Sequence, residues 1–145
     1  MHCIYMGVLN QILRLLFNPQ YKTEPFSLCE KLSIANGRVK NIDLPHFIQR
    51  LLLDSNVNLC YWKASLGRNF FLYIILPVLR GLLPDAYFDN LCMLVEGVSL
   101  LNSASISVSN LDRADRPLFQ FCKDFQRLFG VRHMSLNIHY LRHLA

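Results

Sequence analysis

The sequence predicts a mainly α protein, an irregular bundle of about five to seven helices. Apolar residues recur three and four positions apart through most of the 145 residues, and strand-like alternation is almost nowhere sustained. Capping and helix-stopping residues stand at the ends of these periodic segments. Because a chain of this length can bury one core, we expect a single helical domain over residues 1–145.

Two helices are expected early in the chain, followed by a long connection. The first runs from about Ile4 to Phe17 and is ended by the sequence NPQ. The second runs from about Ser27 to Asn36, with Gly37 as its stop signal. Residues 37–61, which include NIDLPHF, are the least regular part of the chain, and we expect a connection there with one short helix.

The densest apolar stretch, FFLYIILPVLRGLLP, lies in the next predicted helix, from Trp62 to about Leu83. A membrane-spanning helix needs roughly 20 predominantly apolar residues, and the uninterrupted run Phe70–Leu79 has only about 10. We therefore expect a core helix and no membrane contact, with a bend at Pro77. Pro84 marks the turn into a further helix, from Asp85 to about Leu101.

A strongly amphipathic helix is predicted to end at Gly130, which is a stop signal. Ser107, Ser109 and Asn110 are candidates for its N-cap. Pro117 lies inside the segment and is expected to kink the helix or to restart it. The apolar positions follow an i, i+3, i+4, i+7 pattern and are Leu118, Phe121, Cys122, Phe125, Leu128 and Phe129.

The last predicted helix begins at Ser135 and carries two histidines one turn apart. His139 and His143 can reach one zinc ion, but a structural zinc site needs about four ligands. Solvent or a histidine such as His133 would have to supply the others, so we expect only loose binding. The alternative is that both are boundary histidines beside an apolar stripe. That stripe is expected to consist of Leu136, Tyr140, Leu141 and Leu144.

The composition is unusually apolar, with 52% hydrophobic residues and a mean hydropathy of +0.24. Either the core is large, or apolar surface normally meets a partner. The cysteines are an odd number at wide spacing, without a C-x-x-C pair or a recognisable secretory signal, which indicates a reduced, intracellular protein. They are Cys3, Cys29, Cys60, Cys92 and Cys122.

The net charge of +5 lies entirely in the first half of the chain. Nine Lys/Arg stand against four Asp/Glu up to Leu83, whereas the remainder has six of each. A basic face of this kind favours contact with nucleic-acid phosphates, and solvated helix positions are the alternative. The candidate contact residues are Lys31, Arg38, Lys40, Lys63 and Arg68.

Motifs of catalysis are missing: the sequence has no glycine-rich phosphate loop, no G-x-S-x-G and no H-E-x-x-H. Asp112 and Asp115 are expected in the first turn of a helix, where acids favour the helix dipole. Glu96 is either a buried acid that needs a partner or a helix-boundary acid paired with an arginine. Trp62 and the Phe/Tyr residues could stack on bases, but their helical spacing is more typical of a core.

Four sequence blocks, taken in order, resemble the later part of an En/Spm (CACTA) type transposase over nearly the whole chain. They are M-H-C-x-x-x-G-V from Met1, W-K-A-S at Trp62–Ser65, L-P-V-L-x-G-x-L-P at Leu76–Pro84, and N-x-H-x-x-x-H-L from Asn137, which contains His139 and His143. Leu66, where the family has an acid, and the pair Arg116–Pro117 depart from the family pattern.

The resemblance implies a fragment of a larger RNase H-like enzyme that cuts transposon-end DNA with divalent metal ions, Mg²⁺ or Mn²⁺. It also implies that the catalytic acids lie outside this chain, which would then be the helical region before the final catalytic Glu. The expected partners are DNA, bound weakly and without sequence preference, and the rest of a transposase or another protein. The expected location is intracellular, in the nucleus if the protein functions. The alternative is a helical interaction or scaffold domain without a nuclease role.

Overall fold

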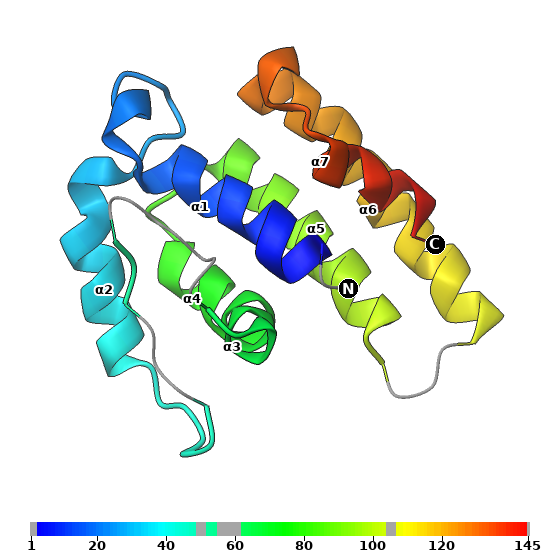
Figure 1. Cartoon of the computed structure of the whole chain (residues 1–145), viewed down its shortest axis with the longest axis horizontal. Coiled ribbons are helices and arrows are strands. Elements are labelled where there is room, and N and C mark those ends of the chain that lie inside the picture. The colour runs from blue at the N-terminus through cyan, green and yellow to red at the C-terminus, as the bar shows by residue number, and fades with distance from the viewer. Residues whose placement is uncertain (1–2, 49–51, 55–61, 104–106, 145) are drawn as a thin grey trace. The chain divides into compact units, whose positions relative to one another are not determined.

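The computed structural model describes residues 3–48, 52–54, 62–103 and 107–144, which are mainly helical and contain no strand (Figure 1). The mainly α prediction is therefore confirmed. The chain divides into two compact units, Met1–Pro84 and Asp85–Ala145, and each is described by itself. That residues 1–145 form one domain stays a prediction. In the described part of the chain, no helix is long and apolar enough to cross a membrane.

The first unit begins with a continuous helical segment, in which a π turn, η1 (Cys3–Val8), leads into α1 (Leu9–Phe17). The segment ends as predicted at Asn18, whose backbone leaves the helix with ψ 129° and whose side chain accepts a hydrogen bond from the Gln20 N–H at 3.0 Å. One face of the segment lies in the core and includes Ile4, Val8, Leu9, Ile12, Leu13, Leu16 and Phe17.

The second helix differs from its predicted bounds. After the short turn η3 (Cys29–Lys31), α2 runs from Leu32 to Asn41 and passes through Gly37. A glycine ends a helix when its φ is positive, and Gly37 has no positive φ, so the predicted stop is wrong. The helix continues because Ala35 and Val39, one turn apart, are both buried.

The predicted connection 37–61 therefore starts with helix, and its residues 49–51 and 55–61 lie outside the described part of the chain. Its described portion at 52–54 is fixed to α2. The Asn36 side chain donates to the Leu53 carbonyl at 2.9 Å and accepts from the Leu53 N–H at 2.7 Å. Asn36 thus replaces the backbone partners that an irregular segment lacks.

The apolar stretch around Pro77 forms a helix of three parts, α3 (Ala64–Asn69), the π turn η5 (Phe70–Ile74) and α4 (Ile75–Leu79). It begins two residues after the predicted start and ends four residues before the predicted end. Pro77 lacks an N–H and its ring crowds the carbonyl four residues back. A π turn precedes α4, and in it the Ile75 N–H donates to the Phe70 carbonyl. The predicted bend at Pro77 stays a prediction.

The second unit is built on two long helices, α5 (Asp85–Leu101) and α6 (Val108–Phe129), which pack side by side (Figure 1). The bounds of α5 are those predicted. Ser107 is the N-cap of α6 and accepts from the Asn110 N–H, and Gly130 ends the helix with φ +96°, both as expected. Pro117 lies inside α6, so the predicted restart is wrong and the helix is one element.

The apolar pattern of α6 is confirmed, since every predicted position is buried except Leu128, which is half-buried. The two helices approach closely at Gly97 of α5. A Cβ placed on Gly97 would lie 2.6 Å from the Leu118 Cγ, so this position leaves no room for a side chain. The φ of Gly97 is not positive, so the backbone conformation does not require glycine here. The close contact between the two helices is the reason for a residue without a side chain.

A short helix, α7 (Leu136–Tyr140), and a final turn, η7 (Leu141–His143), follow α6. The Ser135 cap is confirmed, because its hydroxyl accepts from the Ile138 N–H at 3.3 Å. The predicted stripe is wrong: Leu136 and Tyr140 are 66% and 50% exposed, whereas Ile138 is fully buried beside Leu141. The short element docks on α6, where the Cys122 thiol donates to the Ile138 carbonyl, and this contact selects the buried face.

Candidate functional site

Two of the candidate DNA-contact residues, Lys31 and Arg38, donate hydrogen bonds to backbone carbonyls of the same chain. The Arg38 guanidinium donates from Nη1 to the Val78 carbonyl at 3.0 Å and also to the Arg80 carbonyl. The Lys31 ammonium donates to the Leu82 carbonyl at 3.4 Å. Carbonyls at the end of a helix have no intrahelical donor, and cationic side chains are favourable partners for them. Lys31 and Arg38 thus stabilise the end of α4 and the turn after it.

The other three candidates are exposed, in or beside α2 and α3. Lys40 lies in the last turn of α2, and Lys63 directly precedes α3. Arg68 lies near the Tyr5 hydroxyl: burial raises the pKa of Tyr5, and the guanidinium charge offsets part of that rise. Lys40 and Lys63 are therefore the residues of this set that best suit an external phosphate.

The predicted histidine pair is brought together. His139 in α7 and His143 in η7 are exposed, with ring centroids 5.3 Å apart and planes inclined by 67°. Within the described residues, no group of three or more His, Cys, Asp or Glu side chains could hold a metal ion. Among the described residues the two histidines thus have no further ligand beside them, and loose zinc binding at this pair stays a prediction.

Neither histidine gains a thiolate ligand from Cys122, which lies beneath α7. Its thiol is buried and donates to the Ile138 carbonyl at 3.4 Å. Burial raises the pKa of Cys122 to about 11, and the charge of Arg142 offsets only part of that effect. Among the cysteines with described side chains, Cys29, Cys92 and Cys122 form no disulfide.

Two of the acids singled out in the sequence, Glu96 and Asp112, line an open groove of about 670 Å³ between α5 and α6. Glu96 is exposed in the middle of α5, so both predictions for it, burial and a helix boundary, are wrong. Asp112 lies beyond the first turn of α6, because the helix starts earlier, at Val108. The predicted helix-start role of Asp112 and Asp115 is therefore wrong. Arg113 and Arg116 share the groove with Glu96 and Asp112, so its charges are balanced.

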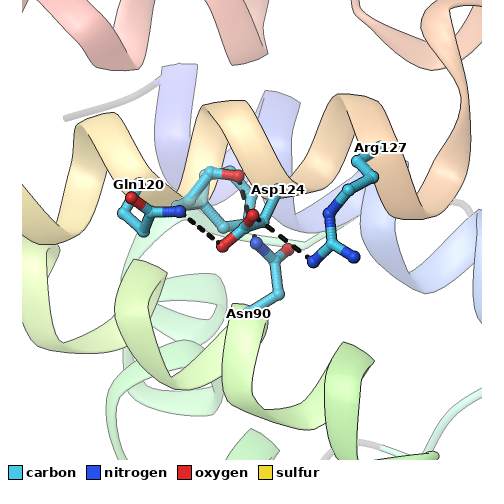
Figure 2. A network of polar contacts seen from close by, with 5 residues as sticks. Asn90, Gln120, Asp124 and Arg127 are labelled. Carbon is cyan, nitrogen blue, oxygen red and sulfur yellow. Dashed lines mark hydrogen bonds and ion pairs between the residues drawn. The ribbon is translucent and has the colours of Figure 1, made fainter.

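Polar contacts lie along the same helix pair, and one of them joins α5 to α6 (Figure 2). Asn90, only 2% exposed, donates from α5 to the Phe121 carbonyl in α6 at 3.0 Å. Asp124 accepts from Gln120 at 2.8 Å and from Arg127 at 3.4 Å, both within α6. Since the partners are internal, these contacts have a structural role.

A smaller hollow of about 140 Å³ lies where α6 meets the last two elements. Its lining includes Phe119, Lys123 and Arg142, none of which the sequence indicated as site residues. One sequence feature could have indicated Phe119 and Lys123: they are four residues apart and lie outside the apolar stripe of α6, so they share another face of the helix. Arg142 could not be added from sequence, because only the fold brings it to α6.

Comparison of the chain with protein families, with curated protein sequences and with solved structures finds no match. Any assignment of function therefore depends on the residues themselves and on the geometry given above.

Proposed function

We propose that the chain is a helical part of an En/Spm (CACTA) type transposase that lacks the catalytic acids and contributes contacts to DNA. The observation that carries this proposal is the order of the four sequence blocks along the chain. Each block alone is short, but their joint order over nearly the whole length is specific. The intact parent binds and cuts transposon-end DNA with Mg²⁺ or Mn²⁺, inside the cell and in its nucleus.

The places of the blocks in the fold support a structural role for their residues. Trp62 of the second block packs edge-on against Phe70, with ring centroids 5.5 Å apart. The third block forms the end of α4 and its turn, whose carbonyls accept from Lys31 and Arg38. The fourth block contains the exposed histidine pair. Met1 and His2 of the first block lie outside the described residues.

Lys40 and Lys63 carry the proposed duplex contact. Both are exposed and belong to the unit with the excess of positive charge. Phosphate contacts release counterions whatever the base sequence, so such binding is weak, sequence-independent and strongly dependent on salt. Arg38 is expected to contribute little, because its guanidinium already binds two carbonyls.

Fluorescence anisotropy with a labelled duplex, measured over a series of salt concentrations, tests this contact. The double variant Lys40→Ala/Lys63→Ala should weaken binding for all sequences and reduce the slope of log K against log[salt] by about 2. Arg113→Ala is the matched control, since Arg113 is an exposed cation of the charge-balanced unit. Binding that ignores salt, or an equal effect of the control, contradicts the proposal.

The second candidate function is a helical protein-interaction domain without a nuclease role. Exposed apolar side chains favour it, among them Ile34, Phe47, Tyr73 and Val131. The genomic sequence on both sides of the coding region separates the candidates. The resemblance implies catalytic Asp residues and a Cys-x-x-Cys pair before Met1 and a catalytic Glu after Ala145. In-frame codons for these residues support the transposase, and a complete gene without them supports the interaction domain.

A further inference from the structure

Phe119 is an aromatic side chain on the outer face of α6, 47% exposed, in a helix whose other described phenylalanines are buried. The guanidinium carbon of Arg142, from η7, lies 5.1 Å from the centroid of the Phe119 ring. Lys123 is one helical turn after Phe119, so both side chains share a face of α6. An exposed ring and two cations are thereby gathered in one place.

These side chains surround the hollow of about 140 Å³, which is also lined by Cys122, Gln126 and Met134. None of the lining residues is an acid, so Lys123 and Arg142 make the hollow positive within a unit that has no net charge. The Cys122 thiol donates a hydrogen bond to Ile138 and stays neutral near pH 7, since its pKa is about 11. No thiolate therefore cancels the two positive charges.

We propose that the Phe119–Lys123–Arg142 hollow binds single-stranded nucleic acid, with an unpaired base stacked on the Phe119 ring and the flanking phosphates at Lys123 and Arg142. Aromatic rings that accept stacked bases beside cations that follow the backbone are the usual features of single-strand binding. A paired base inside a duplex does not offer its face to a protein ring, so the ligand differs from that of Lys40 and Lys63.

The larger groove between α5 and α6 does not suit the same ligand. Glu96 and Asp112 line it together with Arg113 and Arg116, so carboxylates would meet the phosphates there. The hollow at Phe119 combines the aromatic surface with charge of one sign. The positive charge of this hollow is complementary to phosphate groups. It therefore favours a nucleic acid over an apolar partner that has no acidic groups.

Two labelled strands of equal length test the proposal: an oligothymidylate of about 12 nucleotides and its abasic counterpart, which has the phosphates without the bases. The chain should bind the oligothymidylate more tightly than the abasic strand. Phe119→Ala should weaken oligothymidylate binding about tenfold and leave abasic binding unchanged, whereas Phe119→Trp should retain the preference. Arg142→Gln should weaken binding of both strands.

Val131→Ala is the matched control, because Val131 is exposed and apolar but does not line the hollow. Lys40→Ala/Lys63→Ala should leave the preference for bases unchanged, so this inference and the duplex contact can fail separately. Equal affinity for the two strands, or full binding by both Phe119→Ala and Arg142→Gln, overturns the inference. So does a Phe119→Ala variant that loses self-association in sedimentation but binds oligothymidylate normally, because the ring would then contact a second copy of the chain.

Discussion

The guanidinium of Arg38 illustrates what decides the role of a single residue. Sequence pattern places a cation in a basic region, but the acceptors within its reach are two carbonyls of the same chain. Phe119 is the reverse case. Its position outside the apolar stripe of α6 indicates only that the ring is exposed, and the fold brings Arg142 to it. Both roles depend on residues from other elements, and a local pattern does not contain them.

The histidine pair leads to a prediction at the residue scale. Because His139 and His143 form no larger ligand group within the described chain, zinc should be lost on dialysis and should not determine the fold. His139→Ala should lower the zinc held per chain and leave the thermal midpoint unchanged. His46→Ala, which changes an exposed histidine of the other unit, is the control. Titration with free zinc measures the zinc held per chain at equilibrium, metal analysis after dialysis measures its loss, and thermal melts measure the midpoint. One tightly held zinc, with collapse of His139→Ala, would mean that further ligands exist.

Helix starts and stops are governed by a few local signals, and most of them act as the sequence predicts. Asn18, Ser107, Gly130 and Ser135 each end or begin a helix as expected. Gly37 does not, because burial of its neighbours on α2 outweighs the weak helix preference of glycine. The difference between Gly37 and Gly130 is their φ angle, which follows from the surrounding fold.

Two glycine substitutions test this account at the scale of the elements. Gly97→Ala should lower the thermal midpoint: overpacking against Leu118 costs about 1–3 kcal/mol, while the gain in helix propensity is about 1 kcal/mol. Gly37→Ala should raise the midpoint, by up to about 1 kcal/mol in stability, since nothing lies within 4 Å of the new Cβ. Thermal and urea melts of both variants give the comparison. A raised midpoint for Gly97→Ala would contradict the described packing of α5 on α6, and a lowered midpoint for Gly37→Ala would contradict the open space at that position of α2.

The distribution of charge is a property of the whole molecule. Met1–Pro84 has nine Lys/Arg against four Asp/Glu, whereas Asp85–Ala145 has six of each, so the excess coincides with the first compact unit. The two proposed nucleic-acid contacts differ accordingly. The first unit offers separate exposed cations, and the second offers a local positive hollow within a neutral surface.

For the whole chain we predict no nuclease or strand-transfer activity. Two-metal cleavage of a phosphodiester needs acids that hold metal ions about 4 Å apart, and the resemblance implies that these acids lie elsewhere in the parent. Purified protein incubated with supercoiled plasmid and Mg²⁺ or Mn²⁺ should leave it intact, as read on an agarose gel. Metal-dependent nicking that survives repurification and disappears when one Asp or Glu is changed would refute the prediction.

The sequence by itself determined the helical class, the bounds of α5, the capped ends of α6 and its buried face, because these depend on residues within one or two turns of each other. Only the tertiary structure decided which side of α7 is buried, that α2 continues through Gly37, and that Arg38 binds carbonyls. The physical reason is shared by all three: each outcome is set by burial and hydrogen bonds that join segments distant in the chain, and such contacts outweigh local preference.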